Sequence, residues 1–238
     1  MLAMAGTLVL VGLSVATRAW VDRGEQTHLA ALMAWKMFDL STEQNVPTWF
    51  SSSLLLLCGL LAAVVAVLRR VAGQRDAWQW LALAAGFALL SMDETVAIHE
   101  HLQGPAKRAL GHSASGLLHF AWVIPGALIA AVLGLGLVAF VSHLDARVRR
   151  LFVAAAALYA GGALGLEMLG GAVLERYGDR VLYVLTATAE ETFELSGTVL
   201  FLYTLLTCLR LRRAPGGSLW LELSDAARGP SEVPGRSA

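Results

Sequence analysis

The sequence predicts an all-α protein that is embedded in a membrane as a single bundle of about six transmembrane helices. The composition supports this fold class, because 57% of the residues are hydrophobic and only 15% are charged, whereas soluble domains carry about a quarter charged residues. The mean hydropathy is +0.63. Apolar stretches long enough to cross a hydrocarbon core of roughly 30 Å recur along the chain, and short basic turns separate them.

Six segments have the length and composition of membrane spans. They cover residues 2–20, 49–68, 78–99, 116–141, 151–174 and 181–209. The first could instead be a signal peptide, although it has neither a basic N-terminal region nor a clean small-x-small cleavage site. With the spans assigned in this way, residues 1–213 form one transmembrane domain.

The arginines predict the orientation of the spans. Three short turns that are nearly free of acids contain Arg69, Arg70 and Arg75, then Arg147, Arg149 and Arg150, then Arg210, Arg212 and Arg213. Because cytoplasmic loops are enriched in Lys and Arg, these turns are expected to face the cytoplasm, with both termini inside. We expect the acid-rich ends to face outward from a bacterial cytoplasmic membrane.

Two segments lie outside the spans. Residues 21–48 include the apolar stretch 28–38, which is too short to cross a bilayer and predicts an interfacial or re-entrant helix on the outer face. Residues 214–238 are rich in Gly, Pro and Ser and predict a flexible cytoplasmic tail. The formal net charge of +0 argues against a nucleic-acid partner. The expected partner is therefore the lipid bilayer, together with an ion, lipid or small-molecule substrate.

Ionisable side chains inside membrane spans are costly, so each one is a functional hypothesis. Carboxylates from several segments reach a similar depth in the outer half of the predicted bundle, just below Glu43 in the loop that precedes the second span. We predict a carboxylate-rich metal site formed by Asp93, Glu94, Glu100, His101, Glu167, Glu190, Glu191 and Glu194. In a regular helix His99 would point away from this face, which ranks it below the acids.

Helical phase places the deepest acids on inward faces. Glu194 shares a face with Glu190 and Gly197, and Glu167 shares one with Gly170 and other small residues that let helices approach closely. Such a cluster must be neutralised by protons, by basic groups or by a metal cation. Oxygen ligands suit Ca²⁺, Mg²⁺ or Mn²⁺, and an added imidazole suits Zn²⁺ or Fe²⁺.

Structural interpretations of the same residues stay open. Glu43 and Asn45 suit a helix cap ahead of Pro47. The stretch from Asp93 to His101 suits an ordinary polar helix end, and Glu190 or Glu191 suits a wet crevice.

The chain resembles a group of uncharacterised bacterial multi-pass membrane proteins. The likeness rests on segment 43–51, on the Asp93-Glu94 pair followed by His99 and Glu100, and on the glutamates 190, 191 and 194 ahead of Gly197. It extends over about residues 38–210 and implies a shared helical architecture without a known activity.

A local likeness also exists to the alkaline ceramidase-like hydrolases, whose acidic Glu-Asn-Tyr calcium segment is similar to Glu43, Gln44 and Asn45. The chain departs from that family because it lacks the His and Ser that precede the Asp of the later Asp-Glu pair. It also lacks the late His-x-x-x-His pair, so the zinc hydrolase mechanism does not carry over.

Three functions are compatible with the predicted site, and the sequence leaves open whether the protein is an enzyme. The first is a membrane metalloenzyme that acts on a lipid or small substrate, with Asp93, Glu167, Glu191 and Glu194 as the central ligands of a divalent metal cation. The second is a proton- or cation-coupled transporter that uses Glu167 and Glu194. The third is a non-catalytic membrane subunit.

Overall fold

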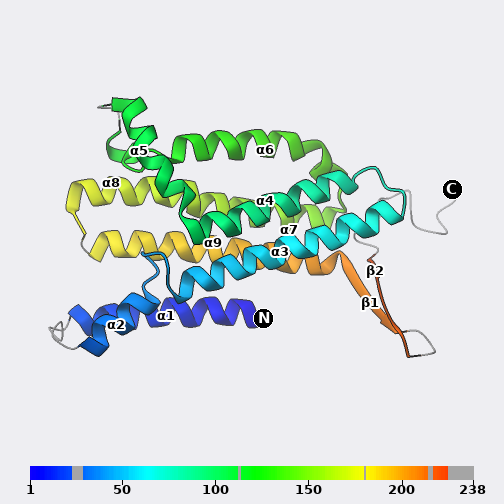
Figure 1. Cartoon of the computed structure of the whole chain (residues 1–238), viewed down its shortest axis with the longest axis horizontal. Helices are drawn as coiled ribbons and strands as arrows, with labels where there is room; N and C mark the ends of the chain where they lie inside the picture. The colour runs from blue at the N-terminus through cyan, green and yellow to red at the C-terminus, as the bar shows by residue number, and fades with distance from the viewer. Residues whose placement is uncertain (23–28, 112–113, 180, 214–216, 225–238) are drawn as a thin grey trace.

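The computed structural model describes residues 1–22, 29–111, 114–179, 181–213 and 217–224, and it is built almost entirely of helices (Figure 1). This confirms the predicted all-α class. The α-helices are α1 (Leu2–Asp22), α2 (Leu29–Phe38), α3 (Val46–Val71), α4 (Ala77–Val96), α5 (Ile98–Leu110), α6 (Val123–His143), α7 (Ala146–Ala160), α8 (Glu167–Tyr177) and α9 (Val181–Thr207). A 3₁₀ turn, η2 (Gly116–Leu118), precedes α6, and a π-helical segment, η3 (Gly161–Leu166), joins α7 to α8.

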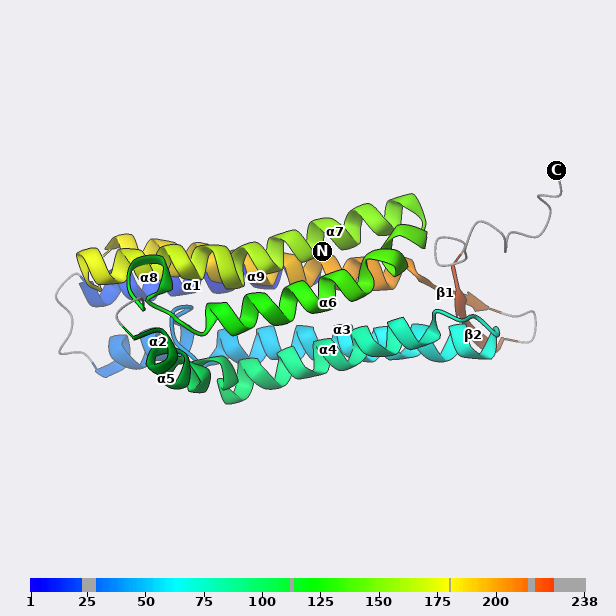
Figure 2. The same ribbon diagram turned by 90° about the horizontal axis from the view of Figure 1, so that it is seen from above.

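The long helices lie side by side along one axis, so the bundle has two distinct ends (Figures 1 and 2). At one end, here called the basic end, lie the α3–α4 and α6–α7 turns and the chain that follows α9. All three arginine-rich turns therefore lie together, as the predicted orientation requires. At the opposite end, here called the acidic end, lie α2, α5 and the loop 39–45.

Within the part of the chain that the structure describes, four helical segments are long and apolar enough to cross a membrane: α1, α3, α6 and the continuous segment Ala146–Tyr177. The pair α4 and α5 qualifies together as a fifth, although it is bent by 80°. Helix α9 has 27 residues, which is span length, but it carries three glutamates. The predicted number of about six spans thus compares with four or five apolar helices of span length and with α9, whose glutamates the prediction had placed inside the last span.

The outer segment and the tail both contain defined structure. A short helix, α2, forms where the apolar stretch 28–38 predicted one. The predicted tail contains a strand, β2 (Leu219–Leu223), which pairs in antiparallel register with β1 (Leu209–Arg213) directly after α9. Residues 214–216 and 225–238 of the predicted tail lie outside the described residues.

Contacts between aromatic side chains in the interior link the helices near the basic end. Trp80 and Phe140 meet edge to face at 5.2 Å between ring centroids, and Phe201 contacts both Phe87 and Phe152 at 5.1 and 5.2 Å. These edge-to-face contacts link α4, α6, α7 and α9.

At the start of α3, the Asn45 side chain accepts a hydrogen bond from the Thr48 amide, and a proline lies in the first turn.

Helices α7 and α9 pack closely because Gly197 has no side chain. A Cβ atom added to Gly197 would lie 2.7 Å from the Tyr159 backbone nitrogen and 3.0 Å from the Ala155 carbonyl oxygen. Backbone atoms cannot move aside as a flexible side chain can. The distance between α7 and α9, and with it the position of the acids on α9, therefore depends on this glycine.

We expect Gly197→Ala to destabilise the protein by about 1–3 kcal/mol, because the added methyl group would overpack a rigid backbone contact. Gly134→Ala in α6 is the matched control, since nothing lies within 4 Å of a Cβ atom there. Thermal unfolding of the two variants in detergent tests the prediction. Equal melting temperatures for both variants would contradict it.

Candidate metal centre

The helix that carries the Asp93-Glu94 pair breaks at Ala97, a residue in the left-handed conformation with φ 54° and ψ 47°. This conformation costs an alanine roughly 1–2 kcal/mol. Two hydrogen bonds to Asp93 offset the cost: its carbonyl oxygen accepts from the Ala97 amide at 2.7 Å, and its Oδ1 accepts from the His99 amide at 2.9 Å. As a result α5 turns across the acidic end of the bundle.

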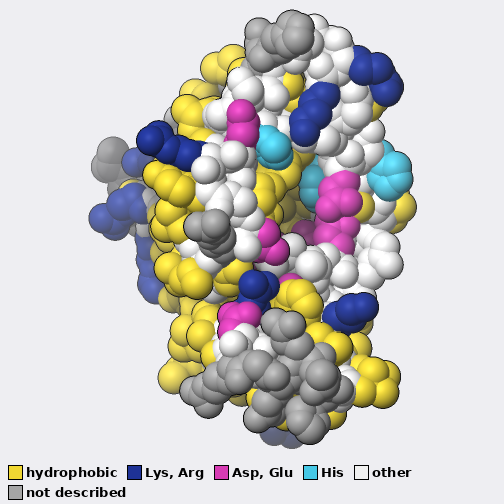
Figure 3. Space-filling view, turned by 90° about the vertical axis from the view of Figure 1, so that its left-hand side faces the viewer, with side chains coloured by type: hydrophobic (Ala, Val, Ile, Leu, Met, Phe, Trp, Pro, Cys, Tyr) yellow, Lys and Arg dark blue, Asp and Glu magenta, His cyan; other side chains and the backbone are white. Residues whose placement is uncertain are grey.

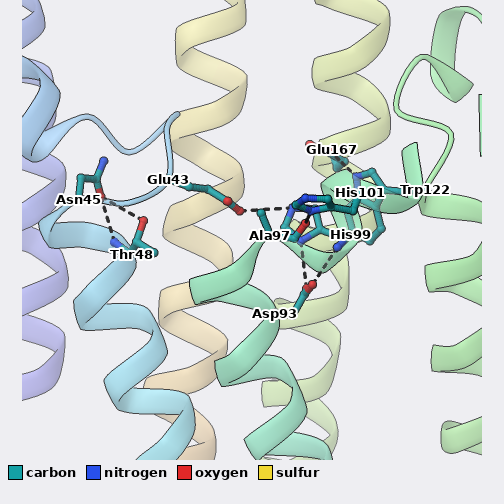
Figure 4. Close-up of polar contacts among 9 residues, drawn as sticks. All are labelled: Glu43, Asn45, Thr48, Asp93, Ala97, His99, His101, Trp122 and Glu167. Atoms are coloured by element: carbon teal, nitrogen blue, oxygen red, sulfur yellow. Dashed lines mark hydrogen bonds and ion pairs between the residues drawn. The ribbon is translucent and has the colours of Figure 1, made fainter. Parts of the chain in front are cut away.

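The break turns the His99 ring back toward the bundle, where it lies between two acids (Figure 4). His99 Nδ1 is 3.0 Å from Asp93 Oδ2, and His99 Nε2 is 3.6 Å from Glu43 Oε1. Because a carboxylate only accepts hydrogen bonds, Asp93 favours the ring form with its proton on Nδ1. Nε2 of a neutral ring is then left with a lone pair.

Three residues from two segments form a group that could hold a metal ion. Glu43, His99 and Glu100 each offer one ligand atom, and these atoms all lie within 4.8 Å of one another. Glu43 and His99 are half-buried, and Glu100 is exposed. Imidazole nitrogen and carboxylate oxygen atoms are both ligands of divalent transition metals.

The loop that carries Glu43 is fixed by hydrogen bonds. The side-chain nitrogen Nδ2 of Asn45 donates to the backbone carbonyl oxygens of Asp39 at 2.6 Å and Thr42 at 2.8 Å. Gln44, which lies between Thr42 and Asn45, has a positive φ of 60°. Burial raises the pKa of Glu43, and the neighbouring Glu100 carboxylate raises it further, although His99 acts in the opposite direction. A bound cation would stabilise the ionised form of Glu43.

The candidate metal-binding group differs in part from the predicted ligand set. Glu100, one of the predicted ligands, is a member of this group. His99, which was ranked below the acids, also belongs to it, because α4 does not continue as a regular helix past Val96. Asp93 is hydrogen-bonded to His99 Nδ1, so it orients the His99 ring from outside the group. His101 Nδ1 is hydrogen-bonded to the Ala97 carbonyl oxygen at 2.6 Å. Asn45 caps α3, so the cap interpretation applies to Asn45 and leaves Glu43 available as a ligand.

The remaining predicted ligands lie deeper between the helices and are half-buried: Glu94, Glu167, Glu190, Glu191 and Glu194. Glu190 interacts electrostatically with Glu167. Glu191 interacts electrostatically with Glu94 and Glu167. These five acids therefore lie near one another, and their use as metal ligands stays a prediction.

The π-helical segment η3 lets α9 approach the helix that carries Glu167. A Cβ atom added to Gly162 would lie 2.8 Å from Glu194 Cγ and 2.9 Å from the Glu190 carbonyl oxygen. Single π-helical turns are frequent at functional sites. The hydropathy of the span contains no sign of this irregularity.

Trp122 connects the metal-binding group to the deeper acids. Its ring lies 4.8 Å from the His99 ring, and its Nε1 donates to Glu167 Oε1 at 2.9 Å. Gln103 Oε1 accepts from the Trp122 amide at 3.1 Å, and its Nε2 donates to the His119 carbonyl oxygen. The sequence does not mark Trp122 as a site residue, because an aromatic residue near a predicted membrane interface is ordinarily a lipid anchor.

The acidic end has a distinct surface (Figure 3). Acidic and histidine side chains gather around the middle of this face. The candidate site thus lies at the surface of the acidic end, and the carboxylates of α9 lie deeper between the helices.

The chain matches the family described as Domain of unknown function (DUF8692) over residues 1–209. No curated protein and no solved structure matches it. Because the match includes most of the chain, the protein belongs to this family. This agrees with the predicted likeness to an uncharacterised group, while the bacterial source and the ceramidase likeness stay predictions.

We expect Ala97→Gly to raise the free energy of unfolding by up to about 1 kcal/mol, because glycine adopts the left-handed conformation without the steric cost. Ala85→Gly on the exposed face of α4 is the control and should lower stability by about 0.5–1 kcal/mol. Denaturant or thermal unfolding in detergent measures both. A destabilising Ala97→Gly would mean that the left-handed bend does not exist in solution.

Proposed function

We propose that this member of the DUF8692 family is an integral membrane protein that binds a divalent metal cation at its acidic end through Glu43, His99 and Glu100. The observation that carries the proposal is the Asp93–His99 pair, with Nδ1 held by a carboxylate and Nε2 directed toward Glu43. Metal-bound histidines commonly donate their other ring N–H group to such a carboxylate, which fixes the ring and increases its basicity.

The ligand set favours Zn²⁺, Mn²⁺ or Fe²⁺ over Ca²⁺, because it includes an imidazole and offers only a few oxygen atoms. Three protein ligands leave coordination positions open for water or substrate, which is typical of catalytic sites. A metal bound there would lower the pKa of a water molecule and polarise an oxygen of the substrate. We therefore propose a hydrolytic membrane metalloenzyme that acts on a lipid headgroup or small molecule at the membrane surface.

We place the protein in a bacterial cytoplasmic membrane with the basic end in the cytoplasm. The three basic turns at one end of the bundle support this orientation. The metal-binding group would then face the outer side, where a lipid headgroup or an extracytoplasmic solute could reach it.

Metal analysis of the full chain in detergent tests the proposal. After incubation with Zn²⁺ or Mn²⁺ and dialysis in chelator-free buffer, the wild type should retain near-stoichiometric metal. His99→Ala and Glu100→Gln should lose it, because each removes a ligand. Asp93→Asn should retain the site with about 10–100-fold weaker affinity. It removes the carboxylate that orients the His99 ring but keeps an amide oxygen that can accept from the His99 backbone amide.

Glu175→Gln is the matched control for the metal analysis. Glu175 is also an acid at the acidic end and contacts a histidine, His119, at 3.3 Å, but it lies outside the proposed ligand set. This variant should bind metal as the wild type does. A folded wild type that retains neither metal, or His99→Ala and Glu100→Gln variants that retain as much as the wild type, would disprove the site.

A second candidate function is proton- or cation-coupled transport, which the carboxyl pair Glu167 and Glu190 favours. The pair lies within the bundle and is linked by Trp122 to His99. Carboxyl groups that face the interior of a membrane bundle are typical of proton relays and ion pathways in transporters. The third predicted role, a non-catalytic subunit, has no comparable supporting observation among the described residues.

We expect the double variant Glu167→Gln and Glu190→Gln to separate the two functions in proteoliposomes. A transporter should lose proton-linked cation uptake while the surface site still binds metal, because neither residue contributes to that site. A double variant with wild-type uptake would exclude this pair as the proton carrier. Glu175→Gln serves again as the control for a charge change at the same end.

A further inference from the structure

The hairpin that follows α9 has one apolar and one polar face. Side chains alternate along a strand, and the register pairs Leu209 with Leu223, Leu211 with Leu221, and Arg213 with Leu219. These residues share the apolar face. Leu211, Leu219 and Leu221 on it are 64, 66 and 45% exposed. The other face holds two further pairs, Arg210 with Glu222 and Arg212 with Trp220.

The base of the hairpin is fixed to the end of α9. The Ser224 amide donates to the Cys208 carbonyl oxygen at 2.9 Å, and its hydroxyl donates to the Thr207 carbonyl oxygen at 2.6 Å. These two carbonyl groups belong to the helix end, where no intrahelical donor remains. Leu223 is buried at the same place. The hairpin is therefore a defined extension of the bundle at the basic end (Figure 1).

The apolar face is turned toward the end of α3. Leu221 and Leu223, together with Glu222 at the edge of the strand, line a groove of about 490 Å³. Its other wall is formed by Leu68, Val71, Ala72 and Gln74. Arg69 and Arg70 lie in the last turn of α3, where the predicted span ends. The exposed leucines of the hairpin consequently lie at the level where hydrocarbon gives way to headgroups.

The charges around the hairpin suit an anionic surface. Arg213 lies on the apolar face itself, and the arginines of the α3–α4 and α6–α7 turns lie at the same end of the bundle (Figure 2). Glu222 is the acid of the hairpin, and it is paired with Arg212 at 2.6 Å. Basic groups next to a membrane helix are attracted to the anionic lipids of the cytoplasmic leaflet.

We propose that the hairpin is a membrane-surface element that inserts Leu211, Leu219 and Leu221 between anionic phospholipids at the basic end, with Arg213 bound to their phosphate groups. The occupant of the groove and of the apolar face is thus phospholipid of the same bilayer that the bundle spans. An extended apolar face that ends in basic residues resembles the amphipathic elements that lie in the interface plane.

Site-specific labelling of the full chain in lipid nanodiscs tests the position of the hairpin. Leu219→Cys and Trp220→Cys place a fluorescent label on opposite faces at adjacent positions, while Cys58 and Cys208 are buried. Brominated phospholipid should quench the label at 219 several-fold more than the label at 220, and aqueous iodide should show the reverse order. Equal quenching at both positions, or free access of iodide to 219, would overturn the proposal and leave the face open to a protein partner.

The lipid class is tested by comparing nanodiscs of phosphatidylcholine with nanodiscs that also contain phosphatidylglycerol. Anionic lipid should increase the bromolipid quenching at 219, and Arg213→Gln should abolish the increase. Arg176→Gln, at the acidic end, is the control and should leave it unchanged. Quenching that is identical in both lipids would overturn the anionic selectivity. None of these readouts depends on metal binding.

Discussion

The candidate site depends on the Asp93 carboxylate, which accepts hydrogen bonds across the break between α4 and α5. Asp93 accepts hydrogen bonds at the backbone and the ring of His99, and these bonds compensate for the left-handed conformation of Ala97. With the break in place, α5 crosses the acidic end of the bundle. His99 then meets Glu43 from a loop more than fifty residues away in the sequence.

Deeper in the bundle, the positions of the carboxylates depend on the close approach of helices at two glycines. Gly162 in the π-helical segment and Gly197 in α9 let backbones touch where any side chain would separate them. Small residues at helix contacts are the usual means of close packing where no hydrophobic force drives helices together in lipid. Here they also bring the carboxylates of α9 near Glu167, and Trp122 joins that region to His99.

The two ends of the bundle differ in the chemistry that they can perform. The acidic end gathers carboxylates and imidazoles that suit a cation, and the basic end gathers arginines and an apolar hairpin that suit anionic lipid. This polarity follows from the bilayer, because charges are excluded from its centre and collect where the helices emerge. A cation-dependent reaction at one surface and an anchor at the other are compatible with one rigid bundle.

The sequence by itself determined the helical class, the approximate spans, the grouping of the arginines and the convergence of the acids. Hydropathy and helical period are local properties, and the Asn45 and Pro47 signals for the start of α3 are local as well. Only the tertiary structure decided that the His99 ring lies beside Glu43, within reach of a shared cation. Alanine has no preference for the left-handed conformation, so nothing in the letters around Ala97 marks the break. The β1–β2 hairpin could not be predicted either. Its second strand lies in a Gly- and Ser-rich stretch, and its strand pairing depends on contacts with the end of α9. The distances between helices at Gly162 and Gly197 exist only once both partners are packed.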